Sequence, residues 1–143
     1  MRSDGTERAV YERRVIWLAS AGALLGLTGV AAGALGAHAL KAVLSPDRLA
    51  VFETAVRYQL IHALALFACG WVLQTWPSRT AFAAGACLFA GTILFSGSLY
   101  ALVLFAKPLL GALAPLGGVG FLAGWVLLVI AVMRSGKSSE TLR

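Results

Sequence analysis

The chain has 143 residues, of which 59% are hydrophobic and 13% are charged, and its formal net charge is +6. A soluble domain has about 25% charged residues, so this composition excludes an ordinary soluble domain and indicates a protein that crosses a membrane several times. The basic residues flank apolar runs and form no continuous patch. The positive charge therefore favours contact with anionic lipid headgroups and argues against nucleic acid as a partner.

The first apolar element runs over residues 15–37 and contains no charged residue, after a mixed-charge tail of residues 1–14. Its length suffices to cross about 30 Å of hydrocarbon. A cleaved signal peptide is the alternative, because Arg13 and Arg14 resemble a basic leader and Ala37-His38-Ala39 resembles a cleavage site. The apolar core of a signal peptide is only about 7–15 residues long, so the length favours a retained span.

Glycines recur along this first span at spacings of four, three, four and three residues, at Gly22, Gly26, Gly29, Gly33 and Gly36. At about 100° per residue they fall within about one quadrant of a helix. A surface without side chains lets another helix approach closely, so we expect these glycines to pack against a neighbour. A second set near the C-terminus is expected to make another close contact, within the bundle or between copies: Gly117, Gly118, Gly120 and Gly124.

Residues 41–57 are the least apolar internal stretch and predict a short interfacial helix that leads into the second span. Ser45 is suited to cap this helix, Pro46 to occupy its first position and Asp47 to lie in its first turn. The remaining spans are predicted at about 58–76, 80–105 and 116–133, followed by a polar tail over 134–143. The fold prediction is all-α: a polytopic four-transmembrane antiparallel helix bundle over residues 15–133.

The distribution of lysine and arginine predicts the orientation. With both termini inside, the inner side holds eight cations: Arg2, Arg8, Arg13, Arg14, Arg79, Arg134, Lys137 and Arg143. The outer side then holds four: Lys41, Arg48, Arg57 and Lys107. Cytoplasmic loops carry the excess of basic residues, so both termini are expected in the cytoplasm. Cys69 and Cys87 lie inside apolar runs and are expected to be free thiols.

Antiparallel connection brings the end of span one, the start of span two, the end of span three and the start of span four to one side. This side receives most of the polar residues of the spans: His38, Glu53, Arg57, Tyr58, Gln59, His62, Ser96, Ser98 and Tyr100. Polar side chains are costly in lipid and normally face the bundle interior or water. We therefore expect a shallow polar pocket in the outer half of the bundle.

The residue types in this pocket do not predict an enzyme or a metal site, because no nucleophile, base and orienting group stand together. Hydrogen-bonded structural histidines are the simplest interpretation. Two ligand hypotheses stay open: a b-type haem between His38 and His62, and a quinone or lipid headgroup held by Arg57, Tyr58 and His62. A small multidrug-type transporter is disfavoured, because the span over 15–37 has no ionisable residue to couple protons.

Four ordered motifs carry a family resemblance: Gly33 to Leu40 (GALGAHAL), Thr54 to Gln59 (TAVRYQ) with His62-Ala63-Leu64, Leu94 to Tyr100 (LFSGSLY), and Pro115 to Gly118 (PLGG) with Gly124-Trp125. Over about residues 15–133 the chain resembles the transmembrane protein 256 family, whose bacterial members carry domain of unknown function 423. The resemblance implies a multi-pass protein of the bacterial inner membrane and implies no activity. The prediction is a non-enzymatic packing, interaction or accessory subunit, with the lipid bilayer and either a membrane protein or a second copy as partners.

Overall fold

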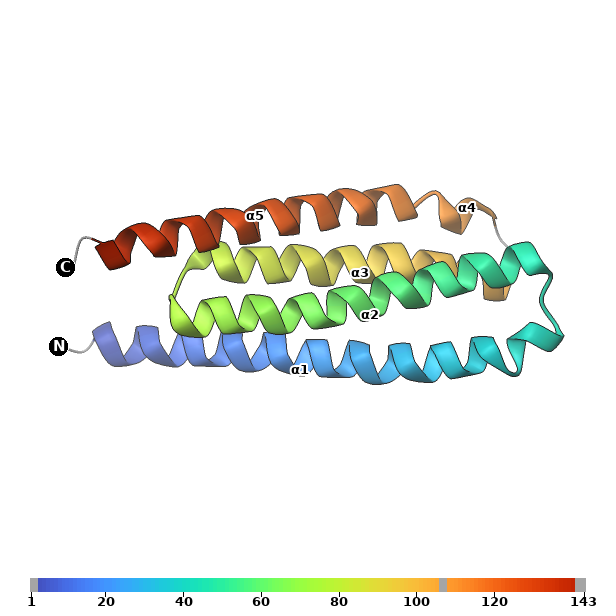
Figure 1. Ribbon diagram of the computed structural model, residues 1–143, viewed down its shortest axis with the longest axis horizontal. Coiled ribbons are helices and arrows are strands. Elements are labelled where there is room, and N and C mark those ends of the chain that lie inside the picture. Colours follow the sequence, from blue (N-terminus) through green and yellow to red (C-terminus); the bar gives the residue numbers. More distant parts are fainter. Residues whose placement is uncertain (1–2, 106–107, 141–143) are drawn as a thin grey trace.

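The computed structural model describes residues 3–105 and 108–140 and arranges them as antiparallel helices, with both chain ends at the same end of the molecule (Figure 1). The elements are α1 (Ser3–Ala37), η1 (Leu40–Ala42), α2 (Pro46–Thr75), α3 (Arg79–Phe105), α4 (Pro108–Gly111) and α5 (Ala114–Glu140). Four helices are long and apolar enough to cross a membrane, and the described residues contain no strand. The prediction of an all-α, four-span protein is confirmed.

The connection between the first two spans differs from the prediction. No separate interfacial helix is present over 41–57: residues from Pro46 onward form the first turns of α2, and only the short 3₁₀ helix η1 precedes them. The drop in hydropathy near Arg57 does not end a helix, because backbone hydrogen bonds continue through exposed polar residues. The predicted cap is confirmed, since the Ser45 side chain accepts a hydrogen bond from the Arg48 backbone N–H at 3.5 Å.

The helices also extend past the predicted apolar spans. α1 begins at Ser3, inside the stretch expected as an N-terminal tail, and α5 runs on to Glu140 in the stretch expected as a C-terminal tail. Hydropathy marks where a helix leaves the hydrocarbon, whereas hydrogen bonding and the absence of Pro decide where it ends. Arg2, Lys107 and Arg143, which entered the prediction of orientation, lie outside the described residues.

Helices α2 and α3 form the centre, with α1 packed mainly on α2 and α5 packed mainly on α3 (Figure 1). In the apolar stretch of α2, 56% of the residues are buried. The corresponding share is 22% in the first span, which includes α1, and 28% in the last span, which includes α5. The main core lies between α1, α2, α3 and α5 around four fully buried leucines: Leu18, Leu66, Leu73 and Leu88. The two outer helices therefore present most of their apolar surface outward.

Glycines set the closest helix approaches. A Cβ added at Gly22 would lie 2.8 Å from the Ala63 carbonyl oxygen, so α1 and α2 nearly touch along their backbones there. Gly91 in α3 and Gly120 in α5 meet in the same way, with 3.1 Å between an added Cβ at Gly120 and the Cα of Gly91. Removing side chains at such points lets helices pack at short range, which supplies dispersion contacts where lipid provides no hydrophobic driving force.

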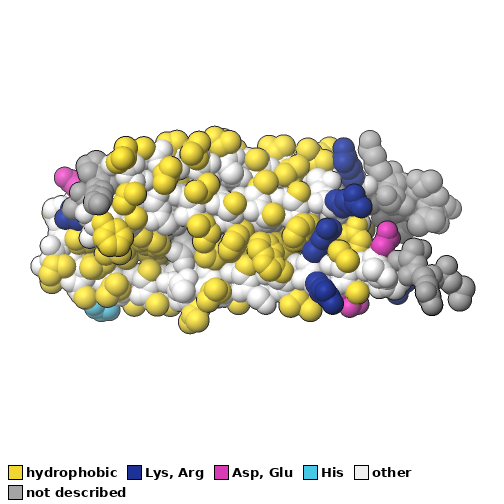
Figure 2. Space-filling model, turned by 180° about the vertical axis from the view of Figure 1, so that it is seen from behind, with side chains coloured by type: hydrophobic (Ala, Val, Ile, Leu, Met, Phe, Trp, Pro, Cys, Tyr) yellow, Lys and Arg dark blue, Asp and Glu magenta, His cyan; other side chains and the backbone are white. Residues whose placement is uncertain are grey.

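Charged side chains gather at the two ends of the molecule and leave an uncharged belt between them (Figure 2). The end that holds the termini carries the described residues Arg8, Arg13, Arg14, Arg79 and Arg134. The other end carries Lys41, Asp47, Arg48, Glu53 and Arg57. This arrangement matches a protein whose apolar belt lies in hydrocarbon and whose ends lie at the two interfaces.

Candidate functional site

Two clusters of polar side chains lie inside the bundle. The first is centred on Gln59 of α2, a residue that is only 5% exposed. Its Nε2 donates to the Leu25 backbone carbonyl and to the Thr28 hydroxyl, at 2.8 Å in both cases. The Tyr100 hydroxyl of α3 donates to Gln59 Oε1 at 2.9 Å. One amide group thereby connects α1, α2 and α3.

The orientation of the Gln59 amide follows from its partners. A backbone carbonyl only accepts hydrogen bonds, so the NH₂ group must face Leu25 and the carbonyl oxygen must face Tyr100. Gly29 makes this reach feasible, because an added Cβ there would lie 3.3 Å from Gln59 Nε2 and 2.7 Å from Leu60 Cδ2. Close packing along the glycine surface of α1 therefore creates the polar contact.

The second cluster is built around His62, one turn further along α2 and 4% exposed. Its ring stacks on Phe121 of α5, with 3.6 Å between centroids and 9° between planes. Trp125 Nε1 lies 3.3 Å from His62 Nε2, and His62 Nδ1 lies 2.7 Å from the Tyr58 carbonyl oxygen. This cluster fastens α2 to α5, two helices that otherwise touch only slightly.

The two contacts of His62 define its protonation pattern. The Trp125 indole can only donate, so Nε2 is the acceptor and Nδ1 carries the proton donated to the Tyr58 carbonyl. Both ring nitrogens are therefore occupied by protein groups. The haem hypothesis required His62 to offer a free nitrogen to iron, and the arrangement of these residues does not fit that role.

The position of His38 also does not suit a haem shared with His62. Gly22 lies beside Ala63, and His38 follows Gly22 by sixteen residues on the same helix, which is about 24 Å at 1.5 Å per residue. His38 is exposed at the end of α1. Among the described residues, no three His, Cys, Asp or Glu side chains are grouped to hold a metal ion, and Cys69 and Cys87 are free thiols.

The residues expected to form one pocket are instead divided among several places. Gln59 and Tyr100 form the first cluster, and Tyr58 and His62 contribute to the second. His38, Glu53 and Arg57 are exposed and join neither cluster. Ser98 donates to the Phe95 carbonyl in its own helix at 2.9 Å, whereas the Ser96 hydroxyl is buried and has no hydrogen-bond partner in the described structure.

The position of these residues along their helix is the other difference, since α2 is longer than the predicted span. Gln59 and His62 lie close to the midpoint of α2, which runs from Pro46 to Thr75. The sequence placed them near one end because it divided α2 into an interfacial helix and a shorter span. Both clusters lie just inside the charged end of the molecule, since Gln59 follows the exposed Arg57 by two residues, about 3 Å along the helix.

Several contributors to these clusters were not singled out from the sequence. Thr28 looked like one more small residue of the first span, and Phe121 looked like an ordinary apolar residue. Trp125 entered the sequence analysis only as part of a family motif, and its indole N–H faces His62. A polar residue within an apolar run was the available signal for Thr28, whereas partners on distant helices depend on packing that local patterns do not specify.

A groove of about 380 Å³ lies over the Gln59 cluster, between α1 and α3. At one end α1 meets α3 through Trp17, whose ring lies 5.1 Å from the Phe89 ring centroid. The groove itself is lined by Leu25, Thr28, Ala32, Gln59, Thr92, Ile93, Ser96, Gly97 and Tyr100. Its lining is mostly apolar and includes no charged side chain.

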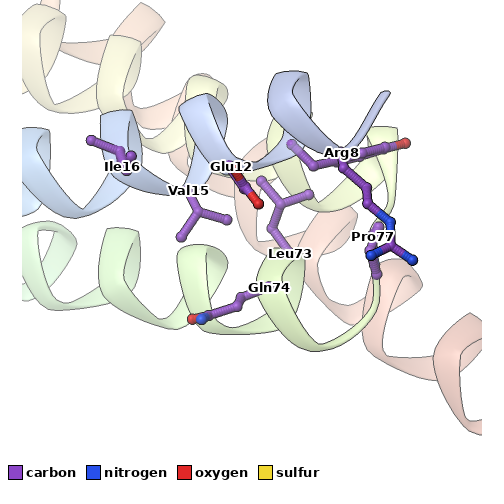
Figure 3. Close-up of a pocket in the computed structure, with 8 residues that line it drawn as sticks. Arg8, Glu12, Val15, Ile16, Leu73, Gln74 and Pro77 are labelled. Atoms are coloured by element: carbon purple, nitrogen blue, oxygen red, sulfur yellow. The ribbon is translucent and has the colours of Figure 1, made fainter. Parts of the chain in front are cut away.

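Figure 3 shows a larger hollow, of about 580 Å³, between the start of α1 and the end of α2. It is lined by Arg8, Tyr11, Glu12, Val15, Ile16, Leu73, Gln74 and Pro77. It contains none of the residues expected in the polar pocket and lies at the end of the molecule that carries the termini. A mixture of charged and apolar lining at this level is typical of contact with the lipid headgroup region.

Comparison with known proteins supplies a family relationship. The family model described as "Protein of unknown function (DUF423)" matches residues 32–118. A UPF0382 membrane protein of Staphylococcus aureus (strain bovine RF122 / ET3-1) is 45% identical over 113 residues, covering 79% of this chain and 92% of the relative. UPF0382 membrane protein YwdK of Bacillus subtilis (strain 168) is 40% identical over 114 residues, covering 79% and 93%. No solved structure matches this chain.

Proposed function

The chain belongs to the DUF423 family of membrane proteins, and we propose that it acts as a non-enzymatic interaction protein, an accessory subunit that binds a membrane partner or a second copy of itself. The polar groups of both clusters are largely used within the chain, where they join helices. The outer helices leave broad apolar faces for a partner.

The observation that carries this proposal is Gly26. An added Cβ at Gly26 would meet nothing within 4 Å, whereas the glycines on either side of it, Gly22 and Gly29, pack closely on α2. Glycine in a helix costs about 1 kcal/mol relative to alanine, and Gly26 gains no contact within the chain in return. Together with Ala19, Ala23 and Val30 it forms the small-residue edge of α1, a surface suited to close approach by another transmembrane helix.

Two charged residues beyond the Val30 end of this edge support the same proposal. Glu53 and Arg57 lie on α2 and are exposed. Arg57 follows Val56, which contacts Gly33, four residues before the end of α1 and hence about 6 Å inside it. A charge exposed at that depth is costly unless it reaches the interface or pairs with another protein, so a partner that supplies polar groups there would stabilise it.

The test uses a photo-crosslinking amino acid in place of Val30, which is 65% exposed on the small-residue edge of α1. We expect a crosslinked product of defined mass in native membranes, and Gly26→Leu should reduce it several-fold while the chain remains folded. The control places the crosslinker at Val129 of α5, which is 55% exposed and far from the edge. Equal, non-specific products at both positions that Gly26→Leu does not change would refute the proposal.

For localisation we propose the bacterial inner membrane with both termini in the cytoplasm. Of the described cations, five arginines lie at the end with the termini and three cations lie at the other end: Lys41, Arg48 and Arg57. The excess favours the terminal end as the cytoplasmic side.

A further inference from the structure

Two arginines from different helices line one depression at the end of the molecule that carries the termini. Arg14 lies on α1, and Arg79 is the first residue of α3. The depression has a volume of about 170 Å³, and the rest of its lining comes from α1: Thr6, Glu7, Val10 and Tyr11. Two positive groups that the fold brings together from separate helices favour the binding of an anion.

Aromatic rings hold the Arg14 guanidinium in place. Its Cζ lies 4.7 Å from the ring centroid of Phe82 in α3 and 5.7 Å from that of Tyr11 in α1. A contact between a cation and a ring is electrostatic and needs no hydrogen-bond acceptor, so it leaves the N–H donors of Arg14 for another group. The guanidinium is therefore fixed in position and can still donate hydrogen bonds.

The protein does not neutralise these two arginines. Within the described part of the chain, neither guanidinium forms a hydrogen bond or an ion pair, and the Arg79 side chain is exposed. The carboxylate of Glu7 also lines the depression, but Glu7 precedes Arg14 by seven residues, or about 10 Å along α1 away from the apolar run. The lining thus carries a net positive charge, with its carboxylate on the side nearer to water.

The position of the arginines relative to the apolar belt indicates which kind of anion binds. Arg14 is the last charged residue before the uncharged run of residues 15–37, and α3 contains no charged residue after Arg79. Both guanidiniums therefore lie at the boundary between hydrocarbon and headgroups, at the level of the lipid phosphates. One turn deeper, Trp17 is 40% exposed and packs on Phe82 with 5.9 Å between ring centroids, which gives acyl chains an apolar surface.

The size of the depression suits a headgroup and excludes an enclosed small molecule. Pockets that enclose a whole small molecule have volumes of about 300–1,000 Å³. The depression is smaller, so it fits a phosphate group whose remainder stays in the bilayer. The larger hollow in Figure 3 is less suited to an anion, because its lining contains one arginine and one glutamate, Arg8 and Glu12, and has no net charge.

We propose that this depression binds the phosphate of an anionic phospholipid, with Arg14 and Arg79 donating to its oxygens and the acyl chains extending past Trp17 into the bilayer. A zwitterionic headgroup such as phosphocholine brings a cation of its own, which the two arginines repel, whereas phosphatidylglycerol brings none. The site is independent of the proposed partner surface, because Gly26 follows Arg14 by twelve residues, about 18 Å along α1.

The neighbouring Arg13 provides a matched control. It is exposed and lines neither the depression nor the larger hollow. Arg13→Gln and Arg14→Gln remove the same charge at nearly the same depth and differ in the side of α1 from which they remove it. Arg79→Gln is the second site variant, and it should not disturb the fold, because the Arg79 side chain is exposed and has no hydrogen bond or ion pair within the described chain.

Native mass spectrometry of the full chain in mild detergent gives the Kd of the first bound lipid. We expect dioleoylphosphatidylglycerol to bind at least about fivefold more tightly than dioleoylphosphatidylcholine, which has the same acyl chains. Arg14→Gln and Arg79→Gln should each raise its Kd about fivefold, which corresponds to about 1 kcal/mol for an arginine near a membrane surface. Arg13→Gln should leave the Kd unchanged. Equal affinity of the wild type for the two lipids, or an equal loss in Arg13→Gln and Arg79→Gln, would overturn the proposal.

A competition arm distinguishes a lipid from a free anion. Inorganic phosphate carries the charged group without acyl chains, and even a large excess is not expected to displace phosphatidylglycerol. Displacement would show a general anion site, and the assignment to a lipid would be wrong. Glu7→Gln should lower the Kd for phosphatidylglycerol, because it removes the negative charge from the lining. An unchanged or higher Kd in this variant would show that the phosphate lies elsewhere.

Discussion

The side-chain amide of Gln59 in α2 donates a hydrogen bond to the backbone carbonyl of Leu25 in α1, across 2.8 Å. Side chains reach the backbone of a neighbouring transmembrane helix only where the two helices lie unusually close. Gly29, one turn from Leu25, provides that closeness. The glycine surface and the polar cluster are thus parts of one arrangement.

Gly29→Leu should destabilise the protein by about 1–3 kcal/mol, because its Cβ alone would lie 2.7 Å from Leu60 Cδ2 and the larger side chain must push α1 from α2. Thermal unfolding in mild detergent measures the effect. Gly26→Leu is the control, since nothing lies within 4 Å of an added Cβ there, and it should equal the wild type in stability or exceed it by up to about 1 kcal/mol. Equal stability of the two variants would mean that this side of α1 faces lipid.

Gln59→Leu should cost about 1–2 kcal/mol of unfolding free energy, because it removes hydrogen bonds to α1 and α3 while keeping a similar volume. Tyr100→Phe should cost less, since it removes one of them. The double variant should reveal a coupling of about 0.5–1 kcal/mol. Strict additivity would show that the contact between Tyr100 and Gln59 contributes nothing.

His62→Ala should cost about 2–3 kcal/mol, because it removes the ring stacked on Phe121 and leaves a cavity. His62→Phe should recover part of this loss, since it restores the stacked ring but leaves the Trp125 N–H without its acceptor. Unfolding followed by near-UV circular dichroism distinguishes the three proteins. Titration of the wild type with haem should produce no bis-histidine spectrum, and its appearance would contradict the assigned structural role.

Ser96→Ala should leave the unfolding free energy of the ligand-free protein unchanged or raise it by up to about 1 kcal/mol, since a buried hydroxyl without a partner is removed. Chemical or thermal unfolding in nanodiscs measures this. Tyr100→Phe serves as the comparison, because its hydroxyl is hydrogen-bonded and its removal should lower stability. A clear loss of stability in Ser96→Ala would show that the hydroxyl has a partner within the protein.

Single cysteines test the orientation of the chain. In a variant without Cys69 and Cys87, Val43→Cys should react with a membrane-impermeant maleimide in intact spheroplasts, because Val43 is 74% exposed in the connection between α1 and α2. Glu7→Cys, exposed near the start of α1, should react only after permeabilisation. The reverse pattern would place the termini outside.

The sequence by itself determined the fold class and the helix-packing character of the first span. Long uncharged runs can cross hydrocarbon only as helices, since every backbone group must be satisfied within the chain, and this constraint is local enough to identify from composition. Local chemistry also marked the start of α2, where Ser45 and Pro46 form a helix start that does not depend on the rest of the protein. Gln59 and His62 stood out because polar side chains are rare in lipid.

Only the tertiary structure decided what those side chains contact. The sequence grouped His38, Gln59 and His62 at one level, but His38 lies at the end of α1, nine residues or about 14 Å past Gly29, which packs beside Gln59. Which neighbour receives each polar group depends on helix rotation and separation, set by packing at glycines such as Gly29 and Gly91. The same packing buries the Ser96 hydroxyl without a hydrogen-bond partner in the described structure. This cannot be predicted from the residue pattern of α3 alone, because it depends on how the neighbouring helices pack against α3.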